Sequence, residues 1–120
     1  MKRDLTHIER EVLAWLASRT ACEALRAQLA TAVVVEREHT GVGSYTDLAV
    51  PADAPRIPDR ALEEVPVRGP MLRGEGIDMD ALSLLWVEDG AITCLELAAF
   101  GEHFPEDCPA VELEEWQGES

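Results

Sequence analysis

The sequence predicts an α+β fold, in which an N-terminal helix or helix pair packs on an antiparallel sheet of two main hairpins. Residues 1–32 repeat apolar side chains at spacings of three and four, which is typical of a helix. Residues 33–50 and 81–99 each hold two strand-like runs around a short turn. Strands joined by hairpins, with the helices kept apart, indicate the α+β class. A chain of 120 residues is expected to form one domain.

The helical segment carries two possible start signals. Thr6 and Glu9 form a capping box, in which two side chains satisfy amides that have no partner inside the helix. Thr20 and Glu23 repeat the same spacing. The segment therefore predicts two short helices with a break near Ser18, or one bent helix. Its apolar stripe begins with Leu5, Ile8, Val12, Trp15 and Leu16.

The stretch REHTGVGSYTDL, residues 37–48, resembles a ligand-binding loop but is better explained as a hairpin turn. It lacks the lysine and the spacing of a phosphate-binding loop, and a strand rather than a helix follows it. Ser44 lacks the G-x-S-x-G context of a catalytic serine. Gly41 and Gly43 then serve backbone geometry.

The second half of the chain alternates a proline-rich connection with a clear hairpin. Residues 51–70 hold five of the seven prolines and predict a long irregular loop with a helical turn at DRALEE. Residues 81–99 flank an Asp-Gly turn. Their nearly continuous apolar runs predict the central strands, covered on at least one face by the N-terminal helix, and Trp86 lies in one of these core strands. Residues 100–120 form an acidic tail with a short edge strand near 111–116.

Charge is the strongest compositional signal. The net charge is -14, yet residues 1–73 hold all ten Lys and Arg against eleven acids. Residues 74–120 hold thirteen acids and no Lys or Arg. Such a field disfavours nucleic acid and anionic membranes, whose phosphates require basic side chains. It favours a basic protein partner, because complementary potentials steer association.

Other classes of protein find little support. Three cysteines without a C-x-x-C do not form a disulfide framework. A zinc site could be drawn from His39, Cys94, His103 and Cys108, but the spacing does not favour it, and no metal or cofactor is predicted. Cys94 lies within a strand, where an inert buried thiol is usual. The chain lacks a signal peptide and any run of about 20 apolar residues, so a cytoplasmic protein is expected.

Two motifs resemble a small bacterial family without an assigned activity. The first is RE-x-TGVG-x-x-TD, formed by Arg37, Glu38, Thr40, Gly41, Val42, Gly43, Thr46 and Asp47. The second is formed by Asp89, Gly90, Leu95, Glu96, Gly101, Glu102 and Pro105. The chain departs from the family pattern at Ser44, Ala98 and Phe104. The resemblance implies an α+β fold and supplies no reaction and no catalytic residues.

Our leading interpretation is a small, acidic, non-enzymatic protein that neutralises a basic partner, as toxin-immunity proteins or antitoxin-like inhibitors do. The predicted partner-binding residues, six acids around an aromatic anchor, are Glu102, Glu106, Asp107, Glu112, Glu114, Glu115 and Trp116. The alternative is a small enzyme or ligand-binding protein, whose pocket would lie near Glu38, His39 and Asp47. A homo-oligomeric structural module is a third possibility.

Overall fold

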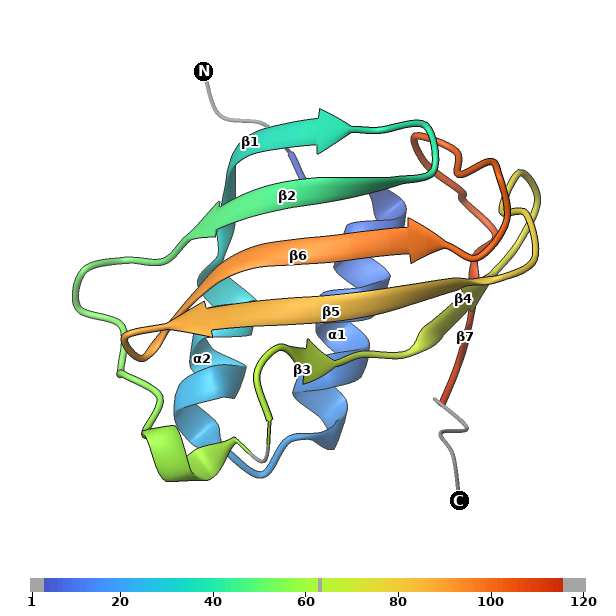
Figure 1. Ribbon diagram of the computed structural model, residues 1–120. Coiled ribbons are helices and arrows are strands. Elements are labelled where there is room, and N and C mark those ends of the chain that lie inside the picture. Colours follow the sequence, from blue (N-terminus) through green and yellow to red (C-terminus); the bar gives the residue numbers. More distant parts are fainter. Residues whose placement is uncertain (1–3, 63, 116–120) are drawn as a thin grey trace.

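The computed structural model describes residues 4–62 and 64–115 (Figure 1). Two α-helices come first, followed by seven strands and one short 3-10 helix. In chain order they are α1 (His7–Arg19), α2 (Glu23–Thr31), β1 (Val33–His39), β2 (Gly43–Ala49), η1 (Asp59–Ala61), β3 (Val67–Arg68), β4 (Met71–Arg73), β5 (Ala81–Glu88), β6 (Ala91–Ala99) and β7 (Glu112–Glu114).

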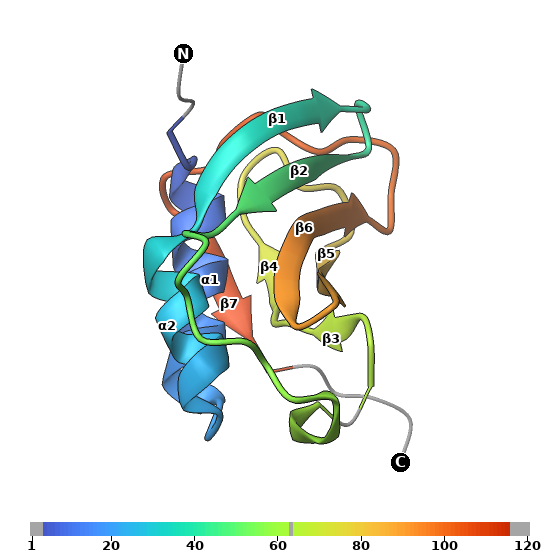
Figure 2. The same cartoon turned by 90° about the vertical axis from the view of Figure 1, so that its left-hand side faces the viewer.

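The strands form one antiparallel sheet in the order β1-β2-β6-β5-β4-β7, and β3 pairs with β5 beside this path. The predicted hairpins are β1–β2 and β5–β6, and the second supplies two central strands, as expected. Both helices lie on one side of the curved sheet, and neither covers the opposite face of β2, β6 and β5 (Figure 2). The predicted α+β class is confirmed.

The backbone amides in the first turn of α1 are hydrogen-bonded by side chains. The Thr6 hydroxyl accepts from the Glu9 amide, and Glu9 accepts from the Thr6 amide, so the predicted capping box is present. The Asp107 carboxylate accepts from the amides of His7 and Ile8 at 3.0 and 3.1 Å. A residue 100 positions away thus completes the cap and fixes the acidic loop against the helix.

The second predicted cap is wrong. Helix α2 begins after Cys22, whose sulfur accepts from the Leu25 amide at 3.4 Å. Thr20 ends α1, because its amide still donates to the Leu16 carbonyl, and its hydroxyl accepts from the Cys22 amide. The Thr20 hydroxyl thus contacts the Cys22 amide and not an amide in the first turn of α2. The break therefore falls between residues 19 and 23, slightly later than predicted.

Both hairpin turns use the glycines that the sequence indicated. Gly41 has φ of +91°, and the Thr40 amide donates to the Gly43 carbonyl at 2.9 Å. A Cβ on Gly43 would lie 2.0 Å from the Leu97 carbonyl oxygen, so only glycine fits this strand contact. In the second turn Asp89 and Gly90 both have positive φ, as an Asp-Gly hairpin requires.

The proline-rich segment is more ordered than the sequence predicted. The helical turn is present as η1, but the two residues of β3 were predicted as loop. Its proline Pro70 is buried, and the Ser83 hydroxyl donates to the Pro70 carbonyl at 2.7 Å. Strand β7 confirms the predicted edge strand and pairs with β4.

Gln28 joins three segments inside the protein. Its amide nitrogen donates to the carbonyls of Pro55 and Gly90, and its oxygen accepts from the Ile92 amide at 2.9 Å. The side chain is completely buried. Because every polar atom of the amide has a partner, this polar residue can fix α2, the loop and the β5–β6 turn together.

Candidate functional site

The uncovered face of the sheet is built from alternate residues of neighbouring strands. Glu38 of β1 lies opposite Tyr45, Tyr45 lies opposite Glu96 of β6, and Glu96 lies opposite Leu84 of β5. Their sequence neighbours, such as Thr46 and Leu95, are buried on the helix side. Because successive side chains of a strand point to opposite faces, this row points away from the helices.

A second row runs parallel to the first, through Glu36, Asp47, Cys94 and Trp86. Trp86 lies in the central strand β5, as predicted, but its side chain is 36% exposed because it points away from the helices. Its indole nitrogen donates to Glu96 at 3.1 Å, which holds the ring against the sheet. Continuous apolar strands are usually buried on both faces, but here the helices cover only one face.

We call the residues of these two rows, together with Leu82, the open face. It contains four carboxylates, two exposed aromatic rings and two leucines. Its members are Glu36, Glu38, Tyr45, Asp47, Leu82, Leu84, Trp86, Cys94 and Glu96. Arg68 of β3, opposite Leu84, lies at its margin. Aromatic side chains within a charged surface are typical of protein interfaces.

Strands β1 and β2 are fixed to α1 by a buried ion pair. Glu9, 1% exposed, accepts from Arg37 at 2.6 and 2.8 Å and from the Thr46 hydroxyl at 2.6 Å. Burial raises the pKa of Glu9, but the hydrogen bonds from Arg37, Thr46 and the Thr6 amide outweigh it, so its pKa lies below the usual value. Glu9 is therefore ionised at neutral pH, and its hydrogen bonds join α1 to β1 and β2, which carry four of the nine open-face residues.

Cys94 lies on the open face but does not suit nucleophilic chemistry. Burial, followed by the negative charge of Asp47, raises the pKa of its thiol to about 11. The reactive thiolate is therefore scarce at neutral pH. The prediction of an inert thiol agrees with this environment, although the side chain is only half-buried.

The acids predicted to bind a partner are distributed around one side of the sheet. Glu102 and Glu106 are exposed on the loop after β6. Glu112 and Glu114 are exposed on the edge strand β7, where Glu114 lies 3.5 Å from Arg73. These four carboxylates are accessible, but they lie on separate elements.

The other predicted partner-binding residues differ in their availability. Asp107 caps α1 and also accepts from the Cys108 amide at 2.8 Å, and these bonds bring its pKa below the usual value although burial raises it. Glu115 is exposed beyond β7. Trp116, the predicted anchor, lies outside the described residues. The carboxylate of Asp107 therefore has a structural role at the start of α1.

The residues of the alternative site do not converge. Glu38 lies opposite Tyr45, and Asp47 lies opposite Glu36, so Glu38 and Asp47 do not form a cross-strand pair. His39 follows Arg37 on the helix side, where its ring lies 6.4 Å from that of Phe104. Its Nδ1 accepts from the Gly41 amide at 3.3 Å. The histidine therefore supports the turn, on the opposite face from the two acids.

Within residues 4–62 and 64–115, no cluster of three His, Cys, Asp or Glu could hold a metal ion. No described helix is long and apolar enough to span a membrane. No protein-family model matches the chain, and neither a curated protein nor a solved structure matches it.

The sequence did not indicate the open face, although part of its signal was present. Tyr45 and Asp47 alternate with Ser44, Thr46 and Leu48. The alternation correctly separates two sets, but both contain polar residues, so it does not show which set is buried. Thr46 is buried because it donates to Glu9, a contact that sequence spacing cannot predict.

Proposed function

We propose that this protein binds a basic protein partner through the open face and blocks the partner's active surface. The observation that carries the proposal is a sheet face that neither helix covers, on which four carboxylates lie around Tyr45 and Trp86. The role is non-enzymatic and is of the kind that toxin-immunity proteins and antitoxin-like inhibitors perform. We place it in the bacterial cytoplasm.

The chemistry of the open face suits arginine and lysine side chains. Its carboxylates can accept charge-assisted hydrogen bonds, and bidentate pairing makes arginine the favoured partner. Tyr45 and Trp86 can take a guanidinium over their rings through cation–π attraction. The leucines supply apolar surface that water leaves on binding. A partner with a basic, partly apolar cleft would satisfy all three features.

The predicted acids outside the open face have a different part in this proposal. Glu102, Glu106, Glu112, Glu114 and Glu115 extend the negative field around the molecule, which accelerates encounter with a basic surface. They need not be buried in the complex. Tyr45 and Trp86 take the role of aromatic anchors that the sequence assigned to Trp116.

Two charge-reversal variants test the proposal. Glu38→Lys with Asp47→Lys changes the open face, and Glu11→Lys with Asp53→Lys changes exposed acids elsewhere. Both variants raise the net charge by four. The wild type and both variants are used to capture proteins from the native host, and mass spectrometry quantifies retention. The expected partner is basic, is retained by the wild type and the control, and is lost from the open-face variant.

The purified partner then gives a quantitative test. Losing two charged contacts in a desolvated interface should cost about 2–5 kcal/mol, or about 30-fold or more in Kd. Reversing Glu102 and Glu106 should mainly slow association, and raised salt should remove that effect. Equal binding by both double variants, or failure to recover any basic partner, would refute the proposal.

A further inference from the structure

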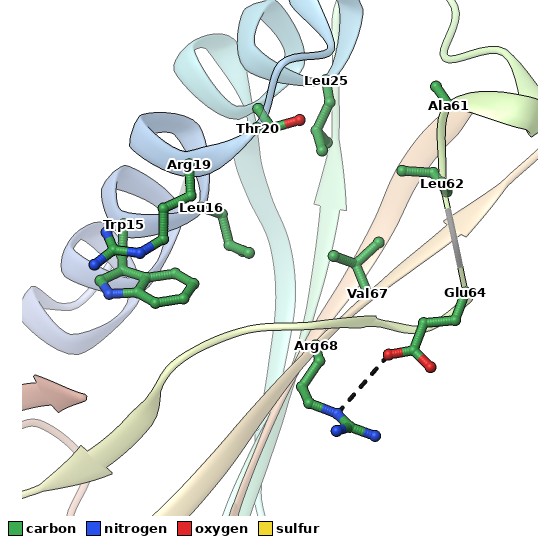
Figure 3. Close-up of a pocket in the computed structure, with 10 residues that line it drawn as sticks. All are labelled: Trp15, Leu16, Arg19, Thr20, Leu25, Ala61, Leu62, Glu64, Val67 and Arg68. Atoms are coloured by element: carbon green, nitrogen blue, oxygen red, sulfur yellow. Dashed lines mark ion pairs between the residues drawn. The ribbon is translucent and has the colours of Figure 1, made fainter. Parts of the chain in front are cut away.

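A pocket of about 290 Å³ lies between the helix pair and the segment 61–68, outside the open face (Figure 3). This volume is at the lower end of small-molecule sites. Its wall comes from both helices, η1 and β3. The lining residues are Trp15, Leu16, Arg19, Thr20, Leu25, Ala61, Leu62, Glu64, Val67 and Arg68.

The interior of the pocket is apolar. Leu16 and Leu25 belong to the buried core, and Leu62 and Val67 pack against that core from the opposite wall. In Figure 3 these four side chains extend toward the same space. An apolar group of a ligand would lose its contact with water there and gain contacts on several sides.

The charged groups lie toward the rim. The Arg19 guanidinium carbon is 3.9 Å from the centre of the Trp15 ring, so the ring holds the guanidinium in place. One of its nitrogens donates to the Ser18 hydroxyl at 3.2 Å. Among the described residues, no carboxylate lies within ion-pair distance of Arg19, although the chain has 24 acids. On the opposite wall, Arg68 lies 3.8 Å from Glu64.

We propose that this pocket binds a small amphipathic carboxylate, with a single aromatic ring or a short aliphatic chain as its body. The apolar body fills the space among Leu16, Leu25, Leu62 and Val67, and the carboxylate accepts hydrogen bonds from Arg19. A guanidinium presents parallel N–H groups that match a carboxylate. The site is independent of the partner-binding face, so either proposal can fail without the other.

The probe for this site is phenylpropionate, compared with its neutral amide. Methyl NMR spectra of the protein should shift at Leu16, Leu25, Leu62 and Val67 on titration with phenylpropionate. The amide has the same body without the charge, so it should bind about tenfold more weakly or worse.

Three variants separate the two parts of the argument. Arg19→Gln should weaken phenylpropionate binding about tenfold and leave the amide unchanged, whereas Arg56→Gln, outside the pocket, should change neither. Ala61→Trp fills the space from an exposed position and should abolish both titrations. Methyl spectra of each free variant show whether it is folded.

The proposal is overturned if phenylpropionate and its amide bind equally, or if Arg19→Gln and Arg56→Gln behave alike. It is also overturned if phenylpropionate shifts none of the four pocket residues up to the concentration at which it shifts surface methyls.

Discussion

Replacing Glu9 with alanine should produce a large loss of stability, although Glu9 lies on the opposite side of the sheet from the open face. Four hydrogen bonds converge on this carboxylate, from the Thr6 amide, the Thr46 hydroxyl and two nitrogens of Arg37. Removing one partner of a buried ion pair typically costs about 3–5 kcal/mol, because the other charge stays behind without compensation. Here the remaining charge is Arg37, whose side chain is 20% exposed.

This cost is a large share of the 5–15 kcal/mol that usually stabilises a domain. At a chain length near 120 residues, each kcal/mol corresponds to about 4 °C, so the Tm should fall by about 12–20 °C. Urea unfolding followed by tryptophan fluorescence measures the free energy directly. The matched control is Glu11→Ala on the exposed face of α1, which should change stability by less than about 0.5 kcal/mol.

The stability that Glu9 contributes should depend on pH. Glu9 has a folded pKa below its ordinary value of 4.5, so its contribution is complete above that value. The contribution is lost as the pH falls from 4.5 through the lowered, folded pKa, because the unfolded state binds a proton at Glu9 more readily than the native state does. As the pH falls below 4.5, the wild type should lose more stability than Glu9→Gln. Equal costs for Glu9→Ala and Glu11→Ala, or parallel pH profiles, would refute this account.

Two further predictions concern positions that the sequence alone would treat as ordinary. Gln28→Leu keeps the side-chain volume but removes the partner of buried backbone groups. The free energy of unfolding measured in urea should fall by about 2–4 kcal/mol. An unchanged free energy would mean that water replaces the side-chain amide. Gly43→Ala forces a Cβ toward the Leu97 carbonyl and should lower the free energy of unfolding by more than about 2 kcal/mol. At Gly41 a Cβ would meet open space, so Gly41→Ala should lower it by about 1 kcal/mol through φ strain alone. If the two glycine variants had equal cost by calorimetry, close strand packing would not be the reason for Gly43.

Local patterns predicted the local structure well. The capping box at Thr6 and the turns at Gly41 and Asp89 each depend on residues within a few positions of one another. The repeat of the capping pattern at Thr20 failed because that residue was already ending α1. A motif of four residues does not show which of two adjacent helices it serves.

Features that depend on distant partners could not be predicted. Glu9 resembled an ordinary capping residue until the structure brought Arg37 beside it, 28 positions later along the chain. Asp107 resembled one acid among many, yet it caps α1. Strand β3 could not be predicted within the proline-rich segment, because its two residues form a strand only through pairing with β5. In each case the deciding contact is tertiary.

The uneven charge of the sequence predicted a partner-binding surface in the second half of the chain, but the open face also uses acids from the first half. Its acids Glu36, Glu38 and Asp47 come from the half of the chain that is nearly neutral overall. Arg37, the basic residue between two of them, points to the opposite face and pairs with Glu9. The strand alternation thus separates Arg37 from these three acids, which leaves the open face acidic.

The same separation of charge argues against a homo-oligomer formed through this face. Two copies related by a two-fold axis would place the carboxylates of Glu36, Glu38, Asp47 and Glu96 against one another. Like charges across an interface are costly, and each copy carries a net charge of -14. Desolvating them would also require partners that a second copy of the open face lacks. A basic surface supplies those partners, so the open face favours a different protein over its own copy.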